Sequence, residues 1–267
     1  MNMYFYELKS LRKSAVLWLC VIVALAAMFL SLYPGVAKDA VDFKELLGNY
    51  PATVRAMLGI NLDYITSLLG FYSMVFSFIS LCGAIQAMNL GVSILSKETR
   101  ERTADFLLAK PVSRKAIVSA KLLAALTVVL AANIVFNAVA MIMANTVKTA
   151  DYSGKLFLMI NLTLLFIQLI FLAVGVVVSV FFKRLKAVLP VSLGFVFGLY
   201  MAGALLATGK DDDVARFVSP FRYFDISYII KNAGYETTYL IAGASIVFAA
   251  TVATYIIYVN KDIHAVN

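Results

Sequence analysis

Six long stretches without Lys, Arg, Asp or Glu divide the sequence and limit what it can fold into. They are 23–33 residues long and comprise residues 14–37, 64–96, 122–147, 156–182, 187–209 and 237–260. An α-helix rises about 1.5 Å per residue, so about 20 apolar residues cross the hydrocarbon core of a bilayer. All six runs reach that length, and no other charge-free run comes near it. The sequence therefore predicts an all-α membrane protein with six transmembrane helices.

The composition agrees with that prediction. Hydrophobic residues make up 62% of the 267 residues and charged residues 14%, whereas soluble domains average about 45–50% and about 25%. We expect a single membrane domain over residues 1–267. Its spans are predicted near residues 14–33, 66–95, 122–145, 157–182, 187–208 and 238–259. The first run could instead be a signal peptide, but its apolar core exceeds the usual length of about 7–15 residues, which favours an uncleaved span.

The charges between the runs predict the orientation. With six spans, both termini lie on one side, which carries fourteen Lys and Arg and five Asp and Glu, while the other side carries nine and ten. Cytoplasmic segments of membrane proteins are enriched in Lys and Arg. We therefore expect a multi-pass plasma-membrane protein with both termini in the cytoplasm, rather than the opposite orientation. This asymmetry accounts for the net charge of +8, so the charge indicates a lipid bilayer and not a nucleic-acid partner.

Two segments outside the runs predict interfacial structure. Residues 1–13 place apolar side chains at helical spacing among charged ones, which favours a helix on the inner leaflet over a plain basic flank. Val214–Ile230 is rich in aliphatic and aromatic residues and is interrupted by Ser219-Pro220. It predicts short helices at the outer leaflet or re-entering it, with a loop anchored by aromatic side chains as the alternative.

Proline and glycine positions suggest where the first two spans end or divide. Pro34-Gly35 predicts the end of the first helix. The second run would form a helix of about 50 Å, longer than a hydrocarbon core of about 30 Å. Either this helix projects beyond the headgroups or its first turns lie on the outer surface. Gly70 or Gly83 could divide it.

The sequence contains no recognisable catalytic motif. There is no Gly-rich phosphate-binding loop of the G-x-x-x-x-G-K-[ST] type and no His, Cys and carboxylate cluster at metal-binding spacing. His264 lies in the C-terminal tail, and Cys20 and Cys82 fall within predicted spans, where we expect neither a disulfide nor a metal site. We therefore predict that the chain is not itself an enzyme.

Polar side chains within the runs are uncharged amides. They are Gln86, Asn89, Asn133, Asn137, Asn161 and Gln168. Amides of this kind usually hydrogen-bond helices to one another, and that is the first interpretation. The alternative is that Gln86, Asn89, Asn133 and Asn137 line a pathway for a partly polar substrate. Ion- and proton-coupled transporters use ionisable residues within the membrane, so their absence here disfavours a secondary transporter.

The densest charged segment, residues 96–121, separates the second and third runs. Lys97–Asp105 predicts a charged helical stretch, and Phe106-Leu107-Leu108 an apolar patch. Pro111 ends the helix, because it disfavours helical geometry at the residue before it, and Ser113 is placed to cap a new helix. Exposed apolar residues rimmed by charge often mark a partner surface. The segment therefore predicts a helical elbow that docks a cytoplasmic partner, rather than a loop that only sets topology.

The elbow resembles the first cytoplasmic loop of ABC-2-type exporter permeases. The features that match are an acidic pair, a Thr, a Leu-rich turn, a Lys-Pro-Val-Ser-Arg run and a Lys at the start of the third span: Glu98, Glu101, Thr103, Phe106-Leu107-Leu108, Lys110–Arg114 and Lys121. Ser219–Asp225 is also similar to a stretch that many members carry before the sixth span. With the six spans, the N-terminal helix and the loop lengths, the resemblance covers essentially the whole chain. Arg102-Thr103 departs from the Gly-Thr that is common there.

The resemblance implies a permease subunit. In such transporters two permease chains, identical or different, pair, and each binds a separate ABC ATP-binding subunit. ATP and Mg²⁺ would then be bound by the partner, with no cofactor in this chain. The elbow would be the coupling helix, seated in a cleft of the ATPase. The residues expected to make this contact are Glu98, Arg100, Glu101, Arg102, Thr103, Asp105, Phe106, Leu107, Pro111, Ser113, Arg114 and Lys115. The alternative function is a membrane sensor or assembly protein that docks a cytoplasmic partner through the same elbow.

Overall fold

The described part of the chain is helical. The computed structural model describes residues 3–58, 60–100, 112–182, 187–206 and 216–260, and no β-strand occurs among them. The helices, in chain order, are α1 (Met3–Lys38), α2 (Ala40–Gly48), α3 (Ala52–Met57), α4 (Leu68–Arg100), α6 (Arg114–Val147), α7 (Gly154–Phe181), α8 (Val188–Leu206), the 3₁₀ turn η1 (Pro220–Arg222), α10 (Ile226–Asn232) and α11 (Thr237–Asn260).

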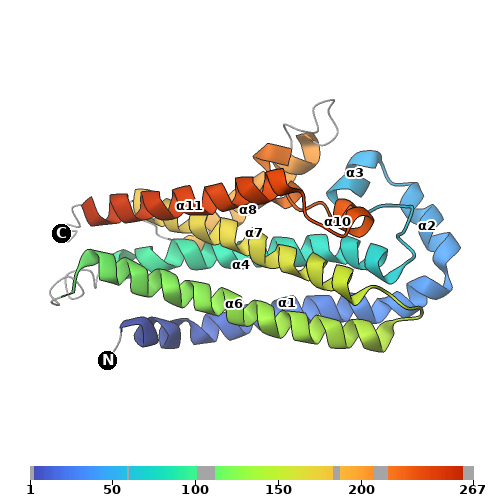
Figure 1. Ribbon diagram of the computed structural model, residues 1–267, viewed down its shortest axis with the longest axis horizontal. Coiled ribbons are helices and arrows are strands. Elements are labelled where there is room, and N and C mark those ends of the chain that lie inside the picture. Colours follow the sequence, from blue (N-terminus) through green and yellow to red (C-terminus); the bar gives the residue numbers. More distant parts are fainter. Residues whose placement is uncertain (1–2, 59, 101–111, 183–186, 207–215, 261–267) are drawn as a thin grey trace.

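Six of these helices are long and apolar enough to cross a membrane: α1, α4, α6, α7, α8 and α11. They run side by side along the long axis of the molecule, and α1 begins near the end where α11 finishes (Figure 1). The helices α2, α3 and α10 gather at the opposite end (Figure 1). This arrangement confirms the predicted all-α fold with six membrane-spanning helices.

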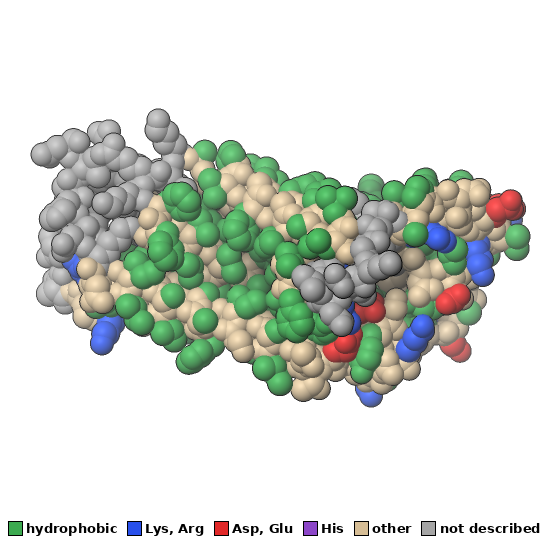
Figure 2. All heavy atoms as spheres, turned by 90° about the horizontal axis from the view of Figure 1, so that it is seen from above, with side chains coloured by type: hydrophobic (Ala, Val, Ile, Leu, Met, Phe, Trp, Pro, Cys, Tyr) green, Lys and Arg blue, Asp and Glu red, His purple; other side chains and the backbone are tan. Residues whose placement is uncertain are grey.

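The surface of the bundle is suited to lipid. On the face shown in Figure 2, hydrophobic side chains are spread along the length of the bundle, whereas the acidic and basic side chains of the described residues cluster mainly toward the α2–α3 end. Large apolar residues such as Ile134 on α6 and Phe248 on α11 are about three-quarters exposed, at 71% and 72%. In water such a surface would be unstable, but in a bilayer it faces hydrocarbon.

The centre of the bundle is the contact between α4 and α7. A Cβ atom added to Gly91 would lie 2.4 Å from the carbonyl oxygen of Leu172, and one added to Gly175 would lie 2.7 Å from that of Met88. Small residues at such a contact let two membrane helices approach backbone to backbone, which increases their van der Waals contact. As a result α4 and α7 are mostly buried, whereas α1 and α11 lie at the periphery and only a small share of their residues is buried.

The helix α1 corrects one prediction and refines another. Pro34-Gly35 does not end the first helix, because α1 continues through both residues to Lys38. Leu30 and Tyr33 are buried against the bundle just before this point, and neighbouring packing keeps a membrane helix intact across a proline. At its other end α1 begins at Met3 without a break before the span, so the predicted N-terminal helix is not a separate element.

The helix α4 is a single helix of 33 residues. Neither Gly70 nor Gly83 divides it. Gly70 instead permits the turn at residues 64–67 to fold against the start of α4, because an added Cβ would lie 1.8 Å from the carbonyl oxygen of Tyr64. Gly83 faces Leu164 on α7, at 2.4 Å from an added Cβ to the leucine Cδ1. Both glycines therefore serve close packing rather than a break.

The segment between the fifth and sixth spans folds back onto the bundle. A helical turn at residues 216–218 ends at Ser219, which is extended, and Pro220 then opens η1. The turn η1 contacts α7 and α8, and α10 contacts α7. Tyr223 and Phe224 are buried within the apolar core. The short helices predicted around Ser219-Pro220 are therefore present, and they form one wall of the cavity described below.

Candidate functional site

The two helices that lead into the predicted elbow are described, but its tip is not. Glu98 and Arg100 lie in the last turn of α4. Seven of the predicted docking residues lie outside the described residues: Glu101, Arg102, Thr103, Asp105, Phe106, Leu107 and Pro111. Their contact with an ATPase therefore stays a prediction. The described flanks nevertheless show how the elbow is attached to the bundle.

The start of α6 has the local structure that the sequence predicted. Ser113 is the N-cap, and its hydroxyl oxygen accepts a hydrogen bond from the backbone N–H of Ala116 at 3.2 Å. Capping of this kind satisfies one of the free N–H groups in the first turn of a helix. Arg114 lies in the first turn and Lys115 is exposed. The capping role predicted for Ser113 is confirmed.

The first turns of α6 are tied to the last turns of α11. The Nη1 of Arg114 donates a hydrogen bond to the carbonyl oxygen of Val259 at 3.2 Å. The hydroxyl groups of Ser119 and Tyr255 are 2.8 Å apart. A guanidinium near the end of α11 also interacts favourably with the negative end of that helix dipole. The base of the elbow and the C-terminal span therefore contact each other directly.

A buried ion pair joins the base of the elbow to the N-terminal turns of α1. The Nζ of Lys121 lies 3.1 Å from Oε1 of Glu7 and donates a hydrogen bond to the carbonyl oxygen of Ile94 at 2.8 Å. Lys121 is fully buried and Glu7 is 3% exposed. Removing one member of a buried pair strands the other charge in an apolar surrounding. One lysine thus connects α1, α4 and α6.

Further polar contacts hold the N-terminal turns in place. The Nζ of Lys97 donates to the hydroxyl of Ser10 at 2.6 Å, and the hydroxyl groups of Tyr4 and Thr127 are 3.0 Å apart. Sequence reasoning treated Glu7 only as part of an amphipathic pattern and so missed its partner. A signal was present, because Glu7 is the sole acidic residue before the first outer loop. An isolated acid beside an apolar run requires a basic partner if it is buried.

The middle of the bundle contains a chain of hydrogen-bonded amides from three helices. The Nε2 of Gln168 on α7 donates to Oε1 of Gln86 on α4 at 2.8 Å, and Nδ2 of Asn133 on α6 donates to Oε1 of Gln168. All three side chains are buried. The structure thus brings Gln86 and Asn133 together through Gln168, which supports their interpretation as contacts between helices.

The other two predicted pathway residues, Asn89 and Asn137, are only half-buried. The Nδ2 of Asn137 donates to the carbonyl oxygen of Asn133 at 2.9 Å within α6, while its Oδ1 is buried with no hydrogen-bond partner among the described residues. Asn89 lies one turn beyond Gln86 on α4. Neither forms part of the amide chain.

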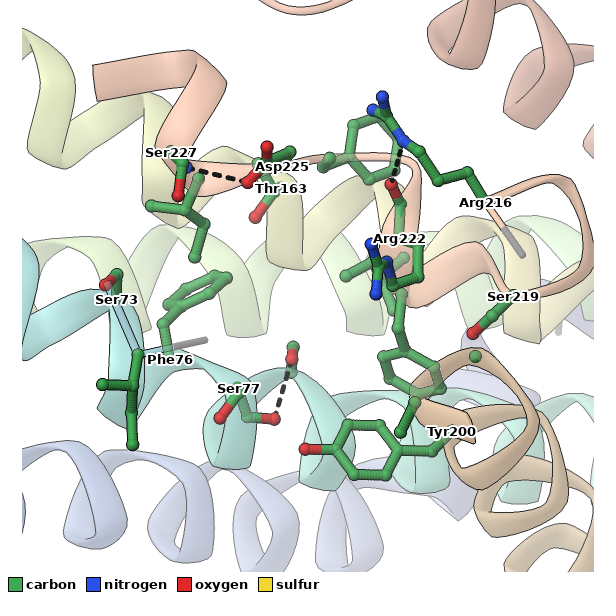
Figure 3. Close-up of a pocket in the computed structure, with 18 of the residues that line it drawn as sticks. Ser73, Phe76, Ser77, Thr163, Tyr200, Arg216, Ser219, Arg222, Asp225 and Ser227 are labelled. Atoms are coloured by element: carbon green, nitrogen blue, oxygen red, sulfur yellow. Dashed lines mark hydrogen bonds between the residues drawn. The ribbon is translucent and has the colours of Figure 1, made fainter. Parts of the chain in front are cut away.

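A cavity of about 280 Å³ lies in the half of the bundle away from the elbow. Its walls are α4, α7, α8, the residues around α3 and the segment 216–227. Figure 3 shows Ser219 and Arg222 extending from that segment, with Ser77 on α4 and Tyr200 on α8 across from them. No local sequence pattern predicts this cavity, because its polar side chains come from five separate parts of the chain.

The rim of this cavity is stabilised by Arg216. Its guanidinium forms an ion pair with Glu236, lies 4.0 Å from the ring centre of Tyr239 and donates from Nε to the carbonyl oxygen of Arg222 at 3.4 Å. Burial lowers the pKa of Arg216, but the hydrogen bond to Glu236 and its negative charge outweigh this and raise the pKa overall. Arg216 therefore connects η1 to the start of α11 as a permanent cation.

Fold and site together define a polytopic helical membrane protein. At one end the base of the elbow is bonded to neighbouring helices, and toward the other end lies a polar cavity. A family model described as ABC-2 family transporter protein matches residues 1–262. The chain therefore belongs to the ABC-2 transporter family, and the predicted family is confirmed. No curated protein is similar enough to count as a relative. As a member of this family, the chain is the permease, the membrane component of a transporter rather than its ATPase, and the family associates with an ABC ATP-binding subunit.

Proposed function

We propose that this chain is the permease of an exporter driven by ATP that a separate subunit hydrolyses. Two permease chains, identical or different, would pair, and each would bind one ABC ATP-binding subunit, which holds the ATP and Mg²⁺. The asymmetry of Lys and Arg between the two sides supports a plasma-membrane protein with both termini in the cytoplasm.

The observation that carries this proposal is the attachment of the elbow. Lys121 links its base to α1 and α4, and Arg114 links it to α11. A loop that only sets topology would not need buried ionic contacts at its base. An elbow fixed to several helices can transmit a movement of a docked ATPase as a rigid-body shift.

The transmitted shift has a direct route to the centre of the bundle. The helix α4 ends at the elbow and packs backbone to backbone on α7 through Gly91 and Gly175. Closely packed helices move together, because there is no free space between them to absorb the movement. In this mechanism Asn89 and Asn137 are the better candidates to line a substrate pathway, since Gln86 and Asn133 already bond to Gln168.

The test is ATPase stimulation in a reconstituted complex. The permease is purified with a co-encoded ABC ATPase, and the rate of ATP hydrolysis is measured with and without the permease in liposomes. We expect that exchanging charges at the elbow, with Glu101→Lys combined with Arg114→Glu, abolishes the stimulation while the permease still inserts and co-purifies as a folded chain.

Lys44 provides a matched control for the exchange of charges at the elbow. Lys44→Glu, on α2 at the other end of the bundle, reverses an exposed charge and should leave the stimulation unchanged. If the elbow variant stimulates the ATPase as well as the wild type does, these two residues do not couple the subunits. If the purified chain transports without any nucleotide-hydrolysing subunit, the proposal itself is wrong.

A further inference from the structure

We propose that the first turns of α1 bind the headgroup of an anionic phospholipid, in the membrane leaflet on the side of the elbow. This inference concerns the permease by itself, so it depends neither on an ATPase nor on the direction of transport. It rests on a hollow lined by basic side chains, on the pairing of the nearby acid with a distant lysine, and on the apolar surface that continues from the hollow.

The hollow has a volume of about 280 Å³ and lies against the first turns of α1, near the N-terminus in Figure 1. The described residues that line it are Tyr6, Lys9, Ser10, Arg12 and Lys13. The three basic side chains are exposed, and none of them forms an ion pair within the described part of the chain. Arg12 and Lys13 lie three and four residues beyond Lys9, so all three share one side of the helix. Such a group of cations suits a phosphate.

The positive charge on this side of α1 is not balanced by the acid beside it. Glu7 is the single acidic residue among residues 1–13. It lies two residues from Lys9, and therefore on the opposite side of the helix, where it is buried against Lys121. A fourth cation adds to the hollow, because Nζ of Lys97 donates a hydrogen bond to the hydroxyl of Ser10 at 2.6 Å. Clusters of Lys and Arg beside a membrane span attract anionic lipids.

The cations lie at the depth of lipid headgroups. Ser14 begins the charge-free run of the first span, and Lys9, Arg12 and Lys13 precede it by one to five residues. The helix α1 is continuous through this region, so at about 1.5 Å per residue these residues lie at most about 8 Å beyond the start of the run. The headgroup layer on each side of a bilayer is roughly 5–8 Å thick. The phosphate groups of the lipids are therefore level with these side chains.

Beyond the cations, the same side of α1 becomes apolar. Val16 and Leu17 lie three and four residues beyond Lys13, and both are more than half exposed. Tyr6, on the other side of the cations, is also more than half exposed, and tyrosines at this level commonly anchor a protein at the interface. A phosphate held by the cations would place its acyl chains along Val16 and Leu17. A soluble anion would use only the basic part, so the apolar continuation favours a phospholipid.

The test places the single tryptophan of the full-length chain beside this surface, with Leu17→Trp combined with Trp18→Phe. Brominated lipid chains quench tryptophan fluorescence on contact. The reporter chain is reconstituted, without an ATPase, into phosphatidylcholine bilayers with rising fractions of dibrominated phosphatidylglycerol, and then with dibrominated phosphatidylcholine. The two quenching curves give the preference for the anionic lipid. We expect a preference of about tenfold or more, because each basic residue near the surface contributes about fivefold in affinity.

A second reporter shows whether the preference belongs to this surface. Phe248→Trp combined with Trp18→Phe places the tryptophan on α11, where the native Phe248 is 72% exposed and lies far from any basic residue in the sequence. Its preference for the anionic lipid should be close to one. Since each preference compares two lipids around the same inserted chain, a lower yield of folded protein does not alter it.

Charge variants of the position 17 reporter identify the residues responsible. The triple variant Lys9→Gln, Arg12→Gln and Lys13→Gln should bring the preference close to one, whereas Lys9→Arg, Arg12→Lys and Lys13→Arg together should keep it. Lys115→Gln removes an exposed cation at the same end that does not line the hollow, and it should leave the preference unchanged. If the triple glutamine variant does not insert, salt decides. At about 1 M NaCl the Debye length falls to about 3 Å, and the preference should fall severalfold.

Three results would overturn the proposal. The first is a preference at position 17 that is close to one or equal to that at position 248. The second is a wild-type preference that persists in the triple glutamine variant or in high salt. The third is loss of the preference on addition of inorganic phosphate at constant ionic strength, because the hollow would then hold a soluble anion instead of a lipid.

Discussion

The two halves of this molecule differ in how their helices are held. At the elbow end, Lys121 and Arg114 join four helices through a buried ion pair and hydrogen bonds to backbone carbonyl oxygens. At the other end, helices and a folded segment surround a cavity, and the buried hydroxyl of Ser219 in that segment has no hydrogen-bond partner among the described residues. The first half is built to keep its helices together, and the second leaves space between them. The firmly bonded elbow end is the end at which we propose that the ATPase docks.

Breaking the ion pair should have the largest effect. Lys121→Met leaves the carboxylate of Glu7 buried without its partner, and the loss of a buried partner costs about 3–5 kcal/mol. We expect a large fall in the thermal midpoint of the detergent-solubilised chain, with Lys115→Met on the exposed side of α6 close to the wild type. The double variant Glu7→Gln with Lys121→Met should regain most of the loss. If Lys121→Met alone is as stable as the wild type, the pair does not hold the elbow end.

A second variant tests the connection between the two halves. Gly91→Ala would place a Cβ 2.4 Å from the carbonyl oxygen of Leu172, so α4 and α7 must separate. Steric overpacking of this kind typically costs about 1–3 kcal/mol. Gly194 on α8 has no heavy atom within 4 Å of an added Cβ, and Gly194→Ala is therefore the control. Equal thermal midpoints for the two variants would show that the close approach of α4 and α7 does not contribute to the stability of the bundle.

The amide chain should contribute less than either. Gln168→Leu removes the side chain that joins Gln86 to Asn133. Hydrogen bonds between membrane helices contribute on average about 0.6 kcal/mol and at most about 1–2 kcal/mol. We expect a modest decrease in the thermal midpoint and folded insertion at wild-type levels. A decrease as large as that of Lys121→Met would show that the main polar contacts between helices lie in the middle of the bundle and not at the elbow end.

The smallest effect is expected from Tyr235, near the cavity end. Burial raises its pKa to about 12, and its hydroxyl donates to the carbonyl oxygen of Met159 at 2.8 Å. Above about pH 10 the unfolded chain loses this proton while the folded chain keeps it, so the stability that Tyr235 contributes falls as pH rises toward 12. The thermal midpoint of Tyr235→Phe should therefore decline less steeply over pH 10–12 than that of the wild type. Identical slopes for Tyr235→Phe and the wild type would contradict the assignment.

Much of the fold could be predicted because it depends on local sequence. Runs of about 20 or more apolar residues that cross a bilayer become helices, since a helix satisfies its backbone hydrogen bonds within one segment, and Ser113 caps α6 as its position indicated. Pro34 shows the limit of such rules, because packing of the residues around it keeps α1 helical. The resemblance of the elbow to ABC-2 permeases identified the family, although its docking residues from Glu101 to Pro111 lie outside the described residues.

The candidate site was less predictable because its contacts join distant parts of the chain. Glu7 and Lys121 are separated by more than a hundred residues, and the cavity takes side chains from α3 to α10. By itself, the sequence determined the class of protein, the number of spans and the charged elbow, because apolar length and charge placement act locally against a bilayer. Only the tertiary structure decided which buried lysine meets which acid and where helices leave a cavity, because those outcomes depend on the packing of whole helices.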